Sequence, residues 1–348
     1  MRYRATADNT AEEAALASGE FFLPAVDLMM PLVQARSIMA GVRLGLFEAL
    51  GREDRTAPEV AAERLLDAAC VELVLRVLVC AGYVRRNGRR YGLTPLARET
   101  MLRNGPRSMC GLAEFNYIQW DMISRLEEVV RHGRGLDFHT TSPGDDSWAS
   151  YQRAMLEFAR FEGPLAAPLV PVRPGASKLL DIGGSHGLIG AMICRRYPGL
   201  RSEVLDLPQA VEHGRKLARE AGIDDVVTHR AGNALLDDLG RDHDVILLAN
   251  VAHHFSPEQN LDLARRARAS LTPGGTFAIW ETEQPGQDAE SDIVGDAFAL
   301  FFRVMSTSRA YEVEEYVGWL EAAGYVDNQA LRPPMGPGMV LVAGRKPV

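Results

Sequence analysis

The chain has 348 residues, of which 47% are hydrophobic, and its 38 basic and 46 acidic side chains give a formal net charge of −8. Length and composition predict a folded protein of two domains and exclude a chain that is disordered throughout. The acidic balance gives no support to broad nucleic-acid binding, which requires an excess of clustered Lys and Arg.

No targeting or membrane segment is expected. The arginines near the N-terminus precede no apolar run of signal-peptide length, and no stretch approaches the ~18 consecutive apolar residues of a membrane helix. Four cysteines lack CxxC and metal-ligand spacing, so we expect free, buried thiols in a reducing cytoplasm. They are Cys70, Cys80, Cys110 and Cys194.

Residues 1–108 are expected to form an all-helical, winged-helix-like dimerisation domain. Residues 21–50 predict two helices separated near Pro31, and both are more apolar than one buried stripe requires. We therefore expect them to pack against a second copy of the chain. Thr56 followed by Pro58 and Glu59 predicts the start of the next helix.

A longer helix over residues 68–80 and a hairpin over residues 83–91, turning at Asn87–Gly88, complete the winged-helix order. Winged helices often bind DNA, but Arg76 is the one basic side chain of the helix that would enter the groove. A major-groove reader needs several polar side chains. The arginines of the hairpin are typical of a solvated edge strand. No nucleic-acid partner is predicted.

Residues 109–170 predict further helices rich in aromatic side chains, which we expect to link the domains and to form part of an acceptor pocket. Residues 171–348 then alternate between strands and helices. The strand 178–182 leads into the turn Gly-Gly-Ser-His-Gly and a helix, an arrangement in which glycine lets a ligand approach free backbone N–H groups. His186, within this turn, is expected to line the ligand site. Asp206 ends the second strand, where a carboxylate can hold ribose hydroxyls.

The turn lacks the GxGxxG spacing of a dinucleotide site, and Asp181 directly before it would repel phosphate. A cationic ligand such as S-adenosylmethionine fits these residues better than NAD. Further strands are predicted at residues 226–229, 244–249, 276–281, 325–331 and 339–344, the last two antiparallel. The expected fold class is α/β, with a seven-stranded, doubly wound, Rossmann-like sheet.

Seven segments spread over both domains resemble the plant-type, small-molecule O-methyltransferase family, which includes the acetylserotonin and caffeic acid methyltransferases. They read LGLFEAL, YGLTPLARE, LLDIGGSHG, VLDLP, AHHFSPEQN, LTPGG and EAAGY. The resemblance implies a homodimer through the N-terminal domain and S-adenosylmethionine as the methyl donor. Gly232–Asn233 stands where the family usually has Gly-Asp beside the adenine. The implied cofactor residues are Asp181, Gly183, Gly184, Gly187, Asp206, Leu207, Gly232, Asn233 and Asn250.

The resemblance also implies a catalytic pair. His253 matches the family's general base, a role that suits imidazole near neutral pH, and Glu281 matches the acid that holds it. Two departures stand out: His254–Phe255 replaces Asp-Trp, and Ser308 replaces a second acid before an arginine. No metal is predicted, although His253 and His254 with Glu281 or Asp296 form an alternative metal site.

The leading prediction is methyl transfer to a hydroxyl of a small, aromatic secondary metabolite. Methylation at carbon or nitrogen on the same fold is the alternative, and a winged-helix regulator that senses a metabolite is a third possibility. Side chains expected to line the acceptor pocket are Asn116, Trp120, Met155, Phe158, Phe298, Phe302 and Met305.

Overall fold

A computed structural model describes residues 7, 9–18, 23–138, 145–286, 293–306, 308–336 and 338–348. The chain divides into two compact units, residues 3–118 and residues 119–348, and the division falls within α7 (Cys110–Ile123). The predicted division at residues 108 and 170 stays a prediction. Phe21 and Phe22 of the predicted opening helix lie outside the described residues.

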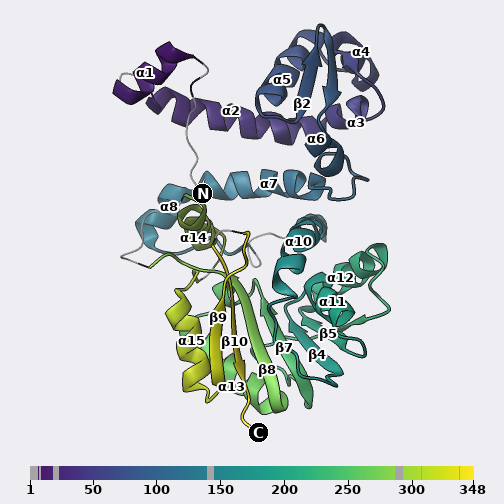
Figure 1. Cartoon of the computed structure of the whole chain (residues 1–348). Helices are drawn as coiled ribbons and strands as arrows, with labels where there is room; N and C mark the ends of the chain where they lie inside the picture. Colours follow the sequence, from purple (N-terminus) through teal and green to yellow (C-terminus); the bar gives the residue numbers. More distant parts are fainter. Residues whose placement is uncertain are drawn as a thin grey trace. The chain divides into compact units, whose positions relative to one another are not determined.

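The unit of residues 3–118 joins helices to a small sheet (Figure 1). The sheet has the order β1-β3-β2 and is antiparallel, so a domain that we expected to be all-helical carries three strands. The hairpin is confirmed, although Gly88 and Arg89 form its turn and Asn87 pairs with Arg90. The elements are α1 (Thr10–Ser18), α2 (Leu23–Arg43), α3 (Leu46–Leu50), β1 (Arg55–Thr56), α4 (Ala57–Arg64), α5 (Ala68–Cys80), β2 (Val84–Asn87), β3 (Arg90–Leu93) and α6 (Pro95–Thr100).

The prediction of a helix break near Pro31 is wrong, because α2 continues through this residue. Proline removes one backbone hydrogen bond, and the carbonyl freed four residues earlier belongs to Asp27, which is exposed and can bind water. The Thr56 cap is confirmed: its side chain and that of Glu59 form a capping box at α4. Cys70 and Cys80 are exposed, contrary to the expectation of buried thiols.

Two of the four hairpin arginines are engaged by acids within the domain. Arg85 donates to both carboxylate oxygens of Asp54 at 2.7 Å, and Arg90 donates to the Asp54 backbone carbonyl and approaches Glu59. These ion pairs lower the positive charge that the hairpin can offer to a phosphate backbone.

The unit of residues 119–348 holds the predicted seven-stranded sheet, in the order β6-β5-β4-β7-β8-β10-β9. The first five strands in this order are parallel, and β10 runs antiparallel to β8 and β9. The strands are β4 (Lys178–Ile182), β5 (Arg201–Asp206), β6 (Val227–Ala231), β7 (His243–Ala249), β8 (Leu271–Thr282), β9 (Val326–Leu331) and β10 (Met339–Arg345).

Helices cover both faces of this sheet, because alternate strand residues point to opposite sides. Leu179 packs with α10, α11 and α12, whereas Leu180 packs with α13 and α15. Figure 1 shows these two groups of helices on opposite sides of the sheet. The helical elements are α8 (Leu126–His132), α10 (Asp145–Ala166), α11 (Leu188–Arg196), α12 (Pro208–Glu220), η1 (Ala252–His254), α13 (Pro257–Ser270), α14 (Ile293–Met305) and α15 (Val313–Ala322).

Candidate active site

The glycine turn after β4 needs its glycines for conformation and for space. Gly183 and Gly187 have φ angles of 66° and 77°, in the left-handed region that favours glycine. A Cβ atom on Gly183 would lie 2.7 Å from Cγ2 of Val251, and one on Gly187 would lie 2.6 Å from Cγ1 of Val227. The turn therefore brings bare backbone to the carboxyl ends of the parallel strands, where open α/β sheets bind ligands.

Asp206 ends β5 and faces this turn. Its Oδ2 accepts a hydrogen bond from the Ser185 backbone N–H at 2.9 Å, and its Oδ1 accepts one from the Leu207 N–H at 2.7 Å. Burial raises the pKa of Asp206 to about 6, so the carboxyl is mostly ionised at neutral pH. An ionised carboxylate held in this way still has lone pairs for two hydroxyl groups.

Asp181 and His186 lie below the turn rather than in a cavity. The Asp181 side chain packs under Gly184, and burial, with a contribution from Asp206, raises its pKa to about 7. Burial lowers the pKa of His186 to about 4, and its neutral ring accepts from the Leu188 N–H at 3.0 Å. His186 is 4% exposed and is not among the residues that line the cavity beside the turn, so its expected place at the ligand site stays a prediction.

A cavity of about 340 Å³ opens above the turn. Six of the nine predicted cofactor residues line it: Gly183, Asp206, Leu207, Gly232, Asn233 and Asn250. The other three, Asp181, Gly184 and Gly187, are not among its lining residues. Predicted contacts of those three with the cofactor stay predictions. The other lining residues are Asp137, Trp148, Tyr151, Gln152, Ile182, Ser185, Leu205, Ala210, Ala234, Leu235, Val251, His254, Phe255 and Gln259.

The lining fits an adenosyl ligand. Gly183 leaves room for close approach, Asp206 offers a carboxylate to a ribose, and apolar side chains such as Leu205 and Leu207 can sandwich a flat base. Asn233 closes this end, and its Oδ1 accepts from the Leu235 N–H at 2.9 Å, which leaves its amide nitrogen as a donor.

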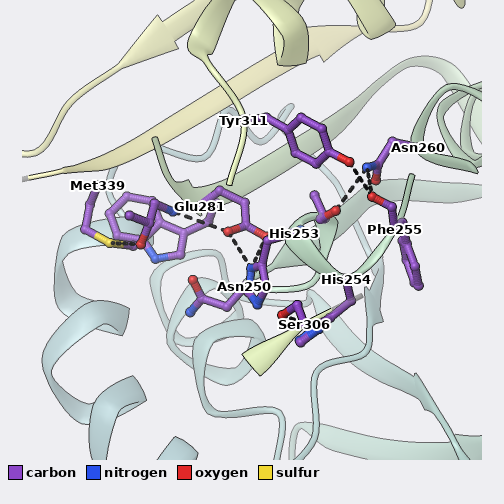
Figure 2. A network of polar contacts seen from close by, with 12 residues as sticks. Asn250, His253, His254, Phe255, Asn260, Glu281, Ser306, Tyr311 and Met339 are labelled. Atoms are coloured by element: carbon purple, nitrogen blue, oxygen red, sulfur yellow. Dashed lines mark hydrogen bonds and ion pairs between the residues drawn. The ribbon is translucent and has the colours of Figure 1, made fainter. Parts of the chain in front are cut away.

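His253 and Glu281 form the predicted pair (Figure 2). The Nδ1 atom of His253 lies 3.0 and 3.1 Å from the two carboxylate oxygens of Glu281, and the side chains are 4% and 0% exposed. A carboxylate accepts hydrogen bonds, so Nδ1 carries the proton and Nε2 is left as the basic nitrogen. The partners reach each other across β7 and β8, since η1 follows one strand and Glu281 ends the other.

Aromatic rings enclose the His253 imidazole. The Phe302 ring from α14 lies 4.1 Å away between centroids, and the His254 ring is equally close. His254 lines the cavity, and its Nδ1 lies 3.0 Å from the Ser306 Oγ (Figure 2). Ser308, which replaces the second acid of the family, places its Oγ 2.6 Å from the Tyr311 hydroxyl rather than beside His253. This position therefore supplies no hydrogen bond to the His253 ring.

The predicted acceptor residues are only partly brought together. Phe302 packs on His253, and the Phe298 ring stacks on Phe302 at 6.2 Å. Met305 is buried, whereas Asn116 belongs to the unit of residues 3–118, and its contact with an acceptor stays a prediction. Partly exposed Trp120, Met155 and Phe158 are not among the cavity-lining residues.

Sequence reasoning missed Glu162 on α10. Its Oε2 accepts from Asn250 Nδ2 at 2.6 Å and from Trp280 Nε1 at 3.3 Å, beside the cavity. No motif marks this residue, and its partners lie 88 and 118 positions away in the chain. The cavity-lining Trp148 and Tyr151 carried an aromatic signal, but the sequence alone does not separate them from core residues.

Within the described ranges, no three His, Cys, Asp or Glu side chains are grouped as a metal site would require. The helices of the described residues include none that is both long and apolar enough to span a membrane.

A seven-stranded sheet with one antiparallel strand, a glycine turn after its first strand and an acid at the end of its second strand together define a Rossmann-like methyltransferase fold. Residues 127–326 match the O-methyltransferase domain family, and residues 26–103 match the O-methyltransferase dimerisation domain. The chain therefore belongs to the O-methyltransferase family and is an S-adenosylmethionine-dependent enzyme.

Relatives span nearly the whole chain. A 3-hydroxy-5-methyl-1-naphthoate 3-O-methyltransferase of Streptomyces sahachiroi is 26% identical over 88% of this chain and 90% of its own. Acetylserotonin O-methyltransferase of Mus musculus is 26% identical over 93% and 88%. The crystal structure of human N-acetylserotonin methyltransferase in complex with SAM covers 99% of this chain and all of its own, with a TM-score of 0.83 at 18% identity.

Proposed function

We propose that the protein transfers a methyl group from S-adenosylmethionine to a hydroxyl of a small aromatic metabolite, with His253 as the general base. The observation that carries this proposal is the buried His253–Glu281 pair, whose neighbour His254 lines the cavity. General-base catalysis by a positioned histidine contributes about 10²–10⁴-fold.

The pair can take up a proton without a movement of either side chain. Glu281 fixes the Nδ1–H tautomer, so Nε2 takes the proton of the acceptor hydroxyl as that oxygen attacks. The imidazolium that results is stabilised by the carboxylate 3.0 Å away, in a place from which Phe302 excludes water.

The cofactor supplies an electrophilic methyl group on a sulfonium. Each part of the cofactor has its own proposed binding residues. The backbone of the glycine turn approaches the amino-acid part, and Gly184 and Gly187 shape this turn above Asp181. Asp206 receives the ribose hydroxyls, while Leu207, Gly232 and Asn233 contact the adenine. The main rate contribution is the alignment of acceptor oxygen, methyl carbon and sulfur.

An aromatic acceptor is supported by the ring cluster on α14. Phe302 and Phe298 offer flat apolar surface beside the base, and Met305, buried on the same helix, is a further proposed contact. Trp120, Met155 and Phe158 are further proposed contacts. Among the relatives are enzymes named for a naphthoate, for tetracenomycin polyketide synthesis and for mitomycin biosynthesis, whose names point to secondary metabolism.

The test is direct. Purified protein is incubated with S-adenosylmethionine carrying a deuterated methyl group and a panel of naphthols, hydroxybenzoates and hydroxyquinones, and products are read by mass spectrometry. The proposal expects a trideuteromethyl ether on at least one phenol. Efficient labelling of phenol-free amines alone, with no phenol labelled, would contradict it.

Methylation at carbon or nitrogen is the second candidate. Relatives include an L-tyrosine C(3)-methyltransferase of Streptomyces lavendulae and an N,N-dimethyltransferase of Streptomyces rimosus. In addition, Ser308 stands in place of the second acid that would assist His253. A two-dimensional NMR spectrum of the labelled product separates a methoxy carbon from a methyl group on carbon or nitrogen.

We further propose a homodimer through α2. Its exposed apolar side chains, such as Leu28 at 78% and Leu32 at 49% exposure, form a face that a lone chain leaves in water. The match to a dimerisation domain supports this face as the interface. Light scattering should give twice the chain mass for the wild type and the single-chain mass for Leu28→Glu combined with Leu32→Glu.

A further inference from the structure

Glu162 is a carboxylate that the proposed mechanism leaves unused. It lies on α10 and is half-buried, with Asn250 and Trp280 both donating to its Oε2. The indole N–H of Trp280 is a donor only, so this oxygen must act as an acceptor. Glu162 thus joins α10 to the carboxyl ends of β7 and β8, at the edge of the sheet where His253 and Glu281 meet.

The hydrogen bond to Glu162 fixes which end of the Asn250 amide is free. Nδ2 is held 2.6 Å from the carboxylate, so the planar amide directs Oδ1 to the other side. Asn250 lines the cavity and has a left-handed φ of 56°, and its backbone N–H donates to the Trp280 carbonyl at 2.8 Å. The residue is therefore held at both its backbone and its side chain.

The sulfonium of S-adenosylmethionine has to lie near Asn250. The base and the transferred methyl meet at one acceptor oxygen, and Asn250 is the lining residue three positions before His253. This step rests on the proposed function, in which His253 is the base. An amide oxygen with a carboxylate behind it is a suitable neighbour for a positive charge in a partly buried site.

We propose that Glu162 is a positioning residue that turns the Asn250 oxygen toward the cofactor cavity, and that the two together stabilise the sulfonium of S-adenosylmethionine. The product S-adenosylhomocysteine has a neutral thioether in place of the sulfonium, so it lacks the methyl group and this charge but keeps the rest of the donor. Glu162 therefore selects the donor over the product and favours product release.

The electrostatic setting of Glu162 supports a response to a nearby cation. The pKa of Glu162 is raised to about 7, because burial outweighs the hydrogen bonds from Asn250 and Trp280, which lower it. Glu281 raises the pKa of Glu162 and His253 lowers it, while Asp206 lines the same cavity and Asp181 is buried beneath the glycine turn. A sulfonium bound nearby lowers the pKa of Glu162, so donor binding releases a proton and strengthens as pH rises through 7.

Glu162→Gln tests the proposal because glutamine keeps an acceptor oxygen for Asn250 and Trp280 but removes the charge. Titration calorimetry is run with S-adenosylmethionine and with S-adenosylhomocysteine. One unit charge at short range in a partly wet site predicts a loss of about five- to tenfold in donor affinity, with product affinity changed by less than about twofold. Glu157→Gln, which changes a buried carboxylate on the same helix, is the matched control and should alter neither affinity.

Two further readouts separate positioning from general structural damage. In steady-state assays, Glu162→Gln should raise KM for the donor while kcat changes less. Calorimetry in buffers of different ionisation enthalpy measures the protons released when the donor binds. At pH 7 the wild type should release about half a proton more than Glu162→Gln does. Equal losses of donor and product affinity, or no loss of either, would overturn the proposal.

A second measurement needs no variant. In the wild type, the ratio of donor to product affinity should rise between pH 6 and 8, as Glu162 ionises. A ratio that is constant over this range contradicts the proposal. Both ligands bind without an acceptor molecule, so this outcome is independent of which hydroxyl, if any, the enzyme methylates.

Discussion

The glycine-rich floor of the cofactor cavity and the cluster of side chains around His253, named the wall, are built in different ways. The floor consists of short turns that directly follow β4, β5 and β6, and a backbone hydrogen bond from the Gly232 N–H to the Asp206 carbonyl ties two of them together. The wall is assembled from η1, β8 and α14, whose side chains meet across long stretches of sequence. The floor depends on backbone shape, and the wall depends on side-chain charge.

This difference predicts that changes in the floor alter cofactor affinity, whereas changes in the wall alter turnover. The largest effect on affinity is expected for Gly183→Val. Its Cβ would overlap Val251 at 2.7 Å, and a φ of 66° is unfavourable for valine. We expect S-adenosylhomocysteine to bind about a hundredfold more weakly, equivalent to about 2.7 kcal/mol, by calorimetry.

Gly222→Val is the matched control for this change. Gly222 also has a positive φ, of 62°, but no atom lies within 4 Å of the place that a Cβ atom would take there. It should lower thermal stability and leave cofactor affinity unchanged. An equal loss of affinity in both variants would refute a specific role of the turn.

In the wall, Glu281→Gln should lower kcat by about thirtyfold with little change in cofactor affinity, because glutamine cannot stabilise the imidazolium as a carboxylate does. Steady-state kinetics on the best phenol measures this. Glu283→Gln removes an acid two residues away whose partner is the surface Arg332, and it should keep full activity. A variant at position 281 that loses cofactor binding instead would erase the contrast between floor and wall.

A smaller effect follows from the pKa of Asp206, which is about 6. The ionised form accepts ribose hydroxyls, and ionisation falls from about nine-tenths at pH 7 to one-tenth at pH 5. Affinity for S-adenosylhomocysteine should therefore fall about tenfold between these pH values. In Asp206→Asn this pH dependence should be lost; a slope that persists would assign it to another group.

The smallest effect is expected for Ser308→Ala. The Ser308 hydroxyl contacts Tyr311, not His253, so kcat should stay within about twofold of the wild type. Comparison with Glu281→Gln, in the same assay, checks that only one acid serves the base. A tenfold loss in Ser308→Ala would show that the second position acts on the base after all.

The same contrast explains what the sequence predicts and what it does not. Strands, the glycine turn and Asp206 follow from local patterns, because short apolar runs and glycines act within a few residues. The His253–Glu281 pair was predicted through family resemblance, not from spacing. Glu162 could not be found in either way, since its role arises from contacts with Asn250 and Trp280 that only the folded chain creates.

Errors of prediction also have physical causes. Helix α2 continues through Pro31 because the carbonyl that loses its partner is exposed to water. His186 lies in the glycine turn by sequence, but its ring is buried and accepts a hydrogen bond from the Leu188 N–H, because successive residues of a turn point in different directions. Side-chain direction in a loop is set by packing that the sequence does not record.

The account depends most on His253 as the base, and one comparison tests it. His253→Ala is assayed with the best phenol while its affinity for S-adenosylhomocysteine is measured by calorimetry. We predict a fall in kcat of about a thousandfold with cofactor affinity within about threefold of the wild type. Full turnover in this variant, with cofactor affinity intact, would contradict the account.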